Sequence, residues 1–187
     1  MGEFEYISVL LSIIIGLGIT QLLSGIARLV RDGRALWSAW WIMLIVATLL
    51  LAHFQVWWVS FGWRHVDQWT FYSYATFMIL PMLLYVLAYL ILPADLRIDG
   101  AELVLEFVDR RKPFYAIVAL VPVASFFQQW MLAGGFELDT DALIRIFWVV
   151  LAIPGFISRR VSVQASVAVL FLAQFVLYIC VLFVRMR

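Results

Sequence analysis

Residues 6–27 read YISVLLSIIIGLGITQLLSGIA and contain no charged side chain. A helix needs about 20 apolar residues to cross the ~30 Å hydrocarbon core of a bilayer, so this stretch predicts a membrane span. Further apolar runs follow, and each is expected to be helical because backbone groups in lipid must be satisfied within the segment. The sequence therefore predicts an all-α, polytopic membrane protein with a single domain of six spans, at about 6–27, 36–60, 70–92, 114–134, 142–158 and 162–184.

The composition agrees with a chain that faces lipid. Of the 187 residues, 66% are hydrophobic and 13% are charged, whereas a soluble domain carries about a quarter charged residues. The net charge of +1 gives no long-range field, which argues against nucleic acid as a partner and leaves the lipid bilayer as the expected one. Cys180 is the only cysteine, so the sequence indicates no disulfide within the chain and no cysteine-based metal or redox motif. No cofactor is predicted.

The distribution of basic residues predicts the orientation. Nine Lys and Arg residues lie in the first, third and fifth connections, and four lie on the opposite side. Because cytoplasmic loops carry the excess of positive charge, both termini are expected outside the cytoplasm. Arg outnumbers Lys twelve to one, which is typical of a GC-rich bacterial source. The predicted location is a bacterial inner membrane, with both termini in the periplasm.

The third connection is the one sizeable cytoplasmic segment. Leu103, Phe107 and Val108 recur at helical spacing, and acidic side chains take the other face. The pattern predicts a helix at about 99–111 that lies on the membrane surface. The alternative interpretation is a helix that binds a partner protein.

The two halves of the chain resemble each other weakly. A shift of 107 residues aligns the first two spans with the fourth and fifth, and six positions agree, among them the pairs Asp32–Asp139, Trp41–Trp148 and Gln21–Gln128. Since each half would hold an odd number of spans, the two halves would be inverted relative to each other. Two inverted three-helix repeats are typical of transporters.

The first span carries a row of small or hydroxylated residues at intervals of four, namely Ser8, Ser12, Gly16, Thr20 and Ser24. Such a ridge lets another helix approach closely and gives hydroxyl groups a partner across the interface. We interpret it as a helix-packing row, either inside the bundle or between two copies of the chain in a homodimer. A polar pathway lined by these hydroxyls is the alternative.

Polar residues within the spans supply the candidate functional site. His53 is the only ionisable residue well inside a predicted span, and such residues are functional candidates by default. We expect it to be neutral, and a structural hydrogen bond to a neighbouring span is the alternative to a functional role. Amides and phenols in lipid also need partners. We predict that a polar pathway near the midplane is formed by Gln21, His53, Tyr85, Gln128 and Gln174.

The motifs of common enzyme classes are missing from the sequence. It has no nucleophile elbow, no zinc-protease motif and no phosphate-binding loop, so no catalytic or metal-binding residue is predicted. The favoured function is a channel or carrier for a small neutral or cationic solute. The alternative is a non-transporting accessory subunit or sensor that uses the helix at 99–111 as its cytoplasmic contact. A membrane enzyme or haem protein is the third interpretation.

Two stretches are similar to known sequences. GLGITQLLSG at 16–25 and DRRKPF at 109–114 resemble a group of small, multi-span bacterial membrane proteins with the same hydropathy along the chain. No activity is known for that group. The resemblance therefore implies a membrane fold and carries over no site residue or ligand.

Overall fold

The computed structural model describes residues 2–32, 35–66, 68–92, 100–135 and 138–182, and these contain helices and no strand. In chain order the helices are α1 (Glu3–Asp32), α2 (Ala35–Ser38), α3 (Trp40–Ser60), the 3₁₀ helix η1 (Phe61–His65), α4 (Phe71–Ile91), α5 (Gly100–Ala133), α6 (Thr140–Ile157) and α7 (Val161–Leu182). Six of them are long and apolar enough to cross a membrane. The predicted class, an all-α protein with six candidate spans, is confirmed.

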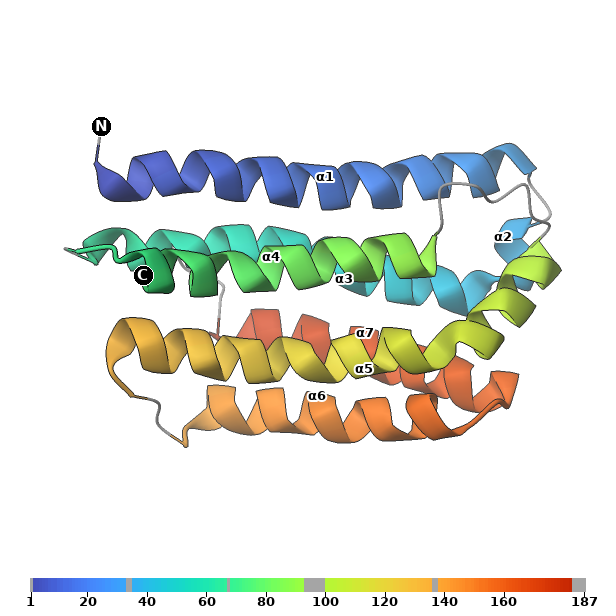
Figure 1. The fold of residues 1–187 in the computed structure, drawn as a ribbon. Coiled ribbons are helices and arrows are strands. Elements are labelled where there is room, and N and C mark those ends of the chain that lie inside the picture. Colours follow the sequence, from blue (N-terminus) through green and yellow to red (C-terminus); the bar gives the residue numbers. More distant parts are fainter. Residues whose placement is uncertain (1, 33–34, 67, 93–99, 136–137, 183–187) are drawn as a thin grey trace.

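The six long helices lie side by side in one bundle (Figure 1). α1 forms one edge and packs mainly on α4, which packs on α5, and α5 packs on α6. α3 packs against α7 and so joins the two halves of the chain. The end of the bundle that holds the N-terminus, where α3 and α5 end and α6 begins, is called the N-terminal end below.

Local sequence signals explain where two of the helices begin. The hydroxyl of Thr70 accepts a hydrogen bond from the backbone N–H of Ser73 at 3.2 Å, which is a capping box at the start of α4. The carboxylate of Asp139 accepts from the backbone N–H of Ala142 at 2.9 Å and caps α6. An acidic N-cap residue is thus the local signal at the start of α6.

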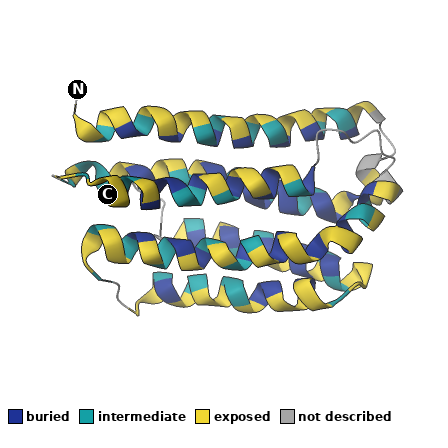
Figure 2. Ribbon diagram, in the orientation of Figure 1, coloured by how far each residue is buried: buried dark blue, intermediate teal, exposed yellow. Residues whose placement is uncertain are grey.

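The packing face of α1 is a narrow seam. Its buried residues recur at intervals of three and four and are Ile7, Leu11, Ile15, Gly18, Leu22, Gly25 and Leu29. A Cβ atom on Gly18 would overlap the ring of His53, and one on Gly25 would overlap the side chain of Leu92. These two glycines therefore let α1 approach α3 and α4 closely. Figure 2 shows that the other faces of the helices are largely exposed, as expected where apolar side chains meet lipid.

The predicted helix-packing row lies on a different face of α1. Ser12, Thr20 and Ser24 are exposed, and Ser8 and Gly16 are only half-buried. A Cβ atom added to Gly16 would meet nothing within 4 Å. Within the chain, therefore, the row does not form the contact between α1 and its neighbours, and pairing with a second copy stays a prediction.

The segment at 99–111 does not form a separate helix. Residue 99 lies outside the described residues, and from Gly100 the backbone runs as one helix, α5, to Ala133. The reason is a continuous buried face, since Leu103, Phe107, Tyr115 and Val118 follow one another at helical spacing. Pro113 lies inside this helix and does not end it.

The helices of the two halves pack differently. In the first half α1 lies mainly against α4, whereas in the second half α5 lies mainly against α6. An inverted repeat would place equivalent helices in equivalent contacts. The repeat therefore stays a prediction from the sequence, without support from the packing.

Candidate ligand-binding cavity

A cavity of about 290 Å³ lies toward the N-terminal end of the bundle. Side chains from all six long helices line it, and most of them are apolar or aromatic, such as Val56, Phe77, Trp148 and Phe175. The polar residues of the wall are Gln55, Ser60, Ser125, Gln128, Gln129, Asp141, Arg145 and Tyr178. An apolar cavity with a few converging polar groups is the usual form of a small-molecule site.

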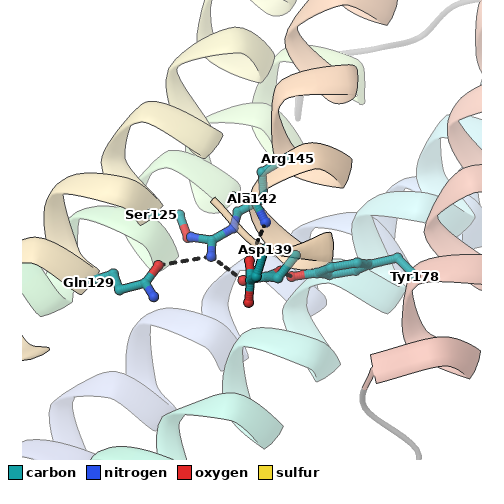
Figure 3. A network of polar contacts seen from close by, with 7 residues as sticks. Ser125, Gln129, Asp139, Ala142, Arg145 and Tyr178 are labelled. Carbon is teal, nitrogen blue, oxygen red and sulfur yellow. Dashed lines mark hydrogen bonds and ion pairs between the residues drawn. The ribbon is translucent and has the colours of Figure 1, made fainter. Parts of the chain in front are cut away.

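An ion pair on α6 forms the polar centre of the wall. Asp141 lies in the first turn of the helix and Arg145 one turn later, so the two side chains share a face and pair. Figure 3 shows the guanidinium group of Arg145 with its hydrogen bond to Gln129. From α5, Ser125 accepts a hydrogen bond from Arg145 Nη1 at 3.1 Å, and Gln129 Oε1 accepts one from Nη2 at 2.9 Å. The guanidinium carbon also lies 4.6 Å from the ring centroid of Phe126, a cation–π contact.

A tyrosine on α7 completes this network. Tyr178 donates a hydrogen bond from its hydroxyl group to Asp141 Oδ1 at 2.6 Å, and the side chain of Gln55 on α3 is hydrogen-bonded to the same tyrosine. Four helices are thus connected through one ion pair. Charges removed from water are tolerated only when paired and hydrogen-bonded, and this arrangement meets both conditions. The pair is also neutral as a unit.

The structure does not bring the five residues of the predicted polar pathway together. Gln128 lines the cavity, whereas Gln21 donates to the carbonyl of Leu92 at 2.7 Å and Gln174 to that of Ile144 at 3.0 Å. Tyr85 is exposed on α4. Only Gln128 is therefore positioned to meet a solute in this cavity.

His53, the fifth member, lies between α3 and α1 and is fully buried. Its Nδ1 lies 2.7 Å from the carbonyl of Leu49, and because a carbonyl only accepts, we assign the hydrogen to Nδ1. Nε2 has no hydrogen-bond partner among the described residues and faces Gly18. The hydrogen bond of His53 is thus made inside α3 and not, as the structural alternative expected, to a neighbouring span, and a functional role for His53 stays a prediction.

The opposite end of the bundle, where α6 ends and α7 begins, holds a buried polar network of its own. The hydroxyl of Tyr115 donates to Gln164 Oε1 at 2.7 Å. Gln164 Nε2 in turn donates to the carbonyls of Gly155 at 2.9 Å and Ser158 at 2.7 Å. Arg111 is buried and donates to the carbonyl of Ile157 at 3.2 Å. These contacts satisfy carbonyl groups at the C-terminal end of α6, which helix geometry leaves without partners.

Sequence reasoning missed most of the polar wall. Asp141 and Arg145 were not among the predicted site residues, yet their spacing of four residues is the signal for a pair on one helix face. Nothing in the sequence connects Tyr178 or Gln55 with that pair, because these residues come from other helices. Their roles required the tertiary structure.

Two further findings bear on the function, one on metal-binding groups and one on the similarity of the chain to known proteins. Among the described residues, no group of three or more His, Cys, Asp or Glu side chains is placed to hold a metal ion. No protein family model, curated protein or solved structure matches the chain. The chain is thus a multi-pass membrane protein by its helices, and its function has to be argued from the cavity.

Proposed function

We propose that this protein is a carrier that binds a small neutral solute in the cavity at the N-terminal end of the bundle. The main support is the mixed character of the wall, in which an apolar lining surrounds one hydrogen-bonded ion pair. Its volume of about 290 Å³ lies near the lower limit for small-molecule pockets. The solute is therefore small.

The charges of the wall favour a neutral solute over a cation. Asp141 and Arg145 cancel each other at short range, so neither sign of ligand charge is attracted from a distance. A cation placed near Asp141 would also meet the guanidinium group. Of the two solute classes expected from the sequence, the neutral one fits the cavity better.

The buried polar network at the other end of the bundle favours a carrier over an open channel. Tyr115, Gln164 and Arg111 are not among the residues that line the cavity, and their hydrogen bonds lie within the protein. A carrier exposes its site to one side at a time, so a cavity in one half of the bundle is the arrangement expected of one of its states. A non-transporting subunit or sensor would also bind solute in such a cavity, and it is the alternative.

The proposed membrane, orientation and homodimer are based on the sequence. We place the protein in a bacterial inner membrane with both termini in the periplasm, which puts the cavity in the periplasmic half. The row from Ser8 to Ser24, in which Ser12, Thr20 and Ser24 are exposed, is available for a homodimer through α1. Replacement of Gly16 and Thr20 by Leu should then abolish a crosslinked dimer in membranes, and an unchanged dimer would show that α1 is not the interface.

A pair of variants on one helix tests the proposed function. Ile144 lines the cavity, whereas Ile146 on the same helix is exposed. Proteoliposomes are loaded with a defined mixture of neutral small solutes, and release is followed by mass spectrometry. We expect protein-dependent release of at least one solute, its loss in Ile144→Trp and its retention in Ile146→Trp.

The other outcomes separate the alternatives. Binding of a solute without release, with binding lost only in Ile144→Trp, would support the subunit or sensor. If Ile144→Trp and Ile146→Trp release solute equally, the cavity is not the functional site.

A further inference from the structure

The hydrogen-bonding groups of the cavity wall indicate the chemistry of the solute. We propose, building on the proposed function, that the solute carries a carbonyl-type acceptor on a mostly apolar body, and that Arg145, Gln129 and Gln128 donate hydrogen bonds to it.

Arg145 has more donors than the protein satisfies. A guanidinium group has five N–H donors. Three are directed at Ser125, Gln129 and Asp141. Nε is buried without a partner in the described part of the chain. Nη1 uses one of its two N–H groups for Ser125, which leaves the second for an acceptor on a bound molecule.

Two glutamines add further donors at the same wall. Gln129 uses Oε1 to accept from Arg145, which leaves its amide N–H groups for another partner. Gln128 is 7% exposed and makes no hydrogen bond to the residues that the structure describes. It lies about one helical turn from Ser125 on α5, so its amide group reaches the same region of the cavity.

The main acceptors of this region are already used. Asp141 accepts from Tyr178 with Oδ1 and pairs with Arg145 through Oδ2. The hydroxyl oxygen of Ser125 accepts from Arg145 as well. Among the described residues, the groups left free at the ion pair are thus N–H donors of Arg145 and Gln129, and there a solute that brings an acceptor fits better than one that brings a positive charge.

The aromatic part of the cavity wall indicates that the solute has a planar body. Trp148 and Phe175 line the cavity with ring centroids 5.2 Å apart, and Phe77 lines it from α4. Aromatic side chains pack favourably against other rings. An aromatic ketone therefore combines the two features of the wall, an acceptor for the donors and a flat apolar surface for the rings.

A matched series of four probes tests this inference on the intact protein in nanodiscs. Benzophenone has a carbonyl acceptor, diphenylmethane has the same rings without it, benzhydrol has a hydroxyl group, and benzhydrylamine is a cation. Binding is measured by calorimetry, and photolabelling by benzophenone is mapped by mass spectrometry. We expect benzophenone to bind about tenfold more tightly than diphenylmethane, which corresponds to about one hydrogen bond, and to label cavity residues.

One variant and its control test whether Gln128 donates a hydrogen bond to the probe. Gln128→Met removes an amide without breaking a hydrogen bond within the described structure, and it should reduce the preference for benzophenone over diphenylmethane several-fold. Gln174→Met, outside the cavity wall, is the control and should keep the preference.

The outcomes separate this inference from the proposed function. Equal binding of benzophenone and diphenylmethane in the cavity would overturn the acceptor preference and leave the carrier proposal standing. Tighter binding of benzhydrol than of benzophenone would overturn it in favour of a group that donates as well as accepts, and tighter binding of benzhydrylamine would overturn it in favour of a cation. If no probe binds in the cavity and Ile144→Trp still releases solute, both the acceptor preference and the carrier proposal are overturned.

Discussion

The contact between Gly18 and His53 leads to a quantitative prediction about how α1 is held. Gly18→Ala should destabilise the protein because the new methyl group would overlap the imidazole ring. The ring is fully buried, and its Nδ1 is held 2.7 Å from the carbonyl of Leu49, so it has little room to move. Overfilling a packed contact costs about 1–3 kcal/mol, and the better helix propensity of Ala offsets up to about 1 kcal/mol of this.

Gly16→Ala is the matched control on the same helix. A Cβ atom at this position meets nothing within 4 Å, so only the gain in helix propensity remains. The difference in free energy of unfolding between the two variants should therefore be about 1–3 kcal/mol, the packing cost alone. Reversible unfolding in mixed micelles, followed by circular dichroism, gives this difference directly.

A double variant checks the physical cause. His53→Ala removes the ring that the new methyl group overlaps, so Gly18→Ala should cost little in that background. A coupling energy near zero between the two positions would show that the overlap is not the reason. Equal stability of Gly18→Ala and Gly16→Ala would refute the close approach of α1 to α3.

Three further predictions concern the polar networks and the orientation. Tyr178→Phe should cost about 1–3 kcal/mol of unfolding free energy, measured in the same micelles, because Asp141 loses a hydrogen bond in a partly buried site; an exposed control, Tyr72→Phe, should cost nothing measurable. Gln164→Leu should cost about 1–3 kcal/mol for each of the groups it leaves unpaired, and a stability equal to that of the parent would mean that water replaces the amide. A reporter fused after Arg110 should give a cytoplasmic signal, and a periplasmic signal there would reverse the proposed orientation.

Much of the fold could be predicted because hydropathy is a local property. Each predicted span overlaps one long helix, and the differences lie at the ends. α1, for example, runs from Glu3 to Asp32, beyond the predicted 6–27, because charged residues can continue a helix outside the hydrocarbon. The larger difference is at α5, where the polar segment and the span share one buried face from Leu103 onward.

The site was harder to predict because the type of a polar residue does not indicate which group its side chain contacts. Gln21, Gln128 and Gln174 are alike in the sequence, yet one reaches a backbone carbonyl of α4, one lines the cavity and one reaches a carbonyl of α6. His53, the most conspicuous residue in the sequence, packs between two helices away from the cavity wall. Arg145 was within reach of sequence reasoning, through its spacing from Asp141.

By itself the sequence determined that the chain is a bundle of lipid-facing helices, since apolar runs of this length have no other way to satisfy their backbone groups in a bilayer. Only the tertiary structure decided which polar groups meet. Asp141 and Tyr178 are 37 residues apart, and Arg145 and Gln129 are 16 apart, so their contacts depend on how whole helices are rotated and packed. The rotation and packing of the helices depend on how many buried side chains fit together at once, and no local sequence pattern contains this information.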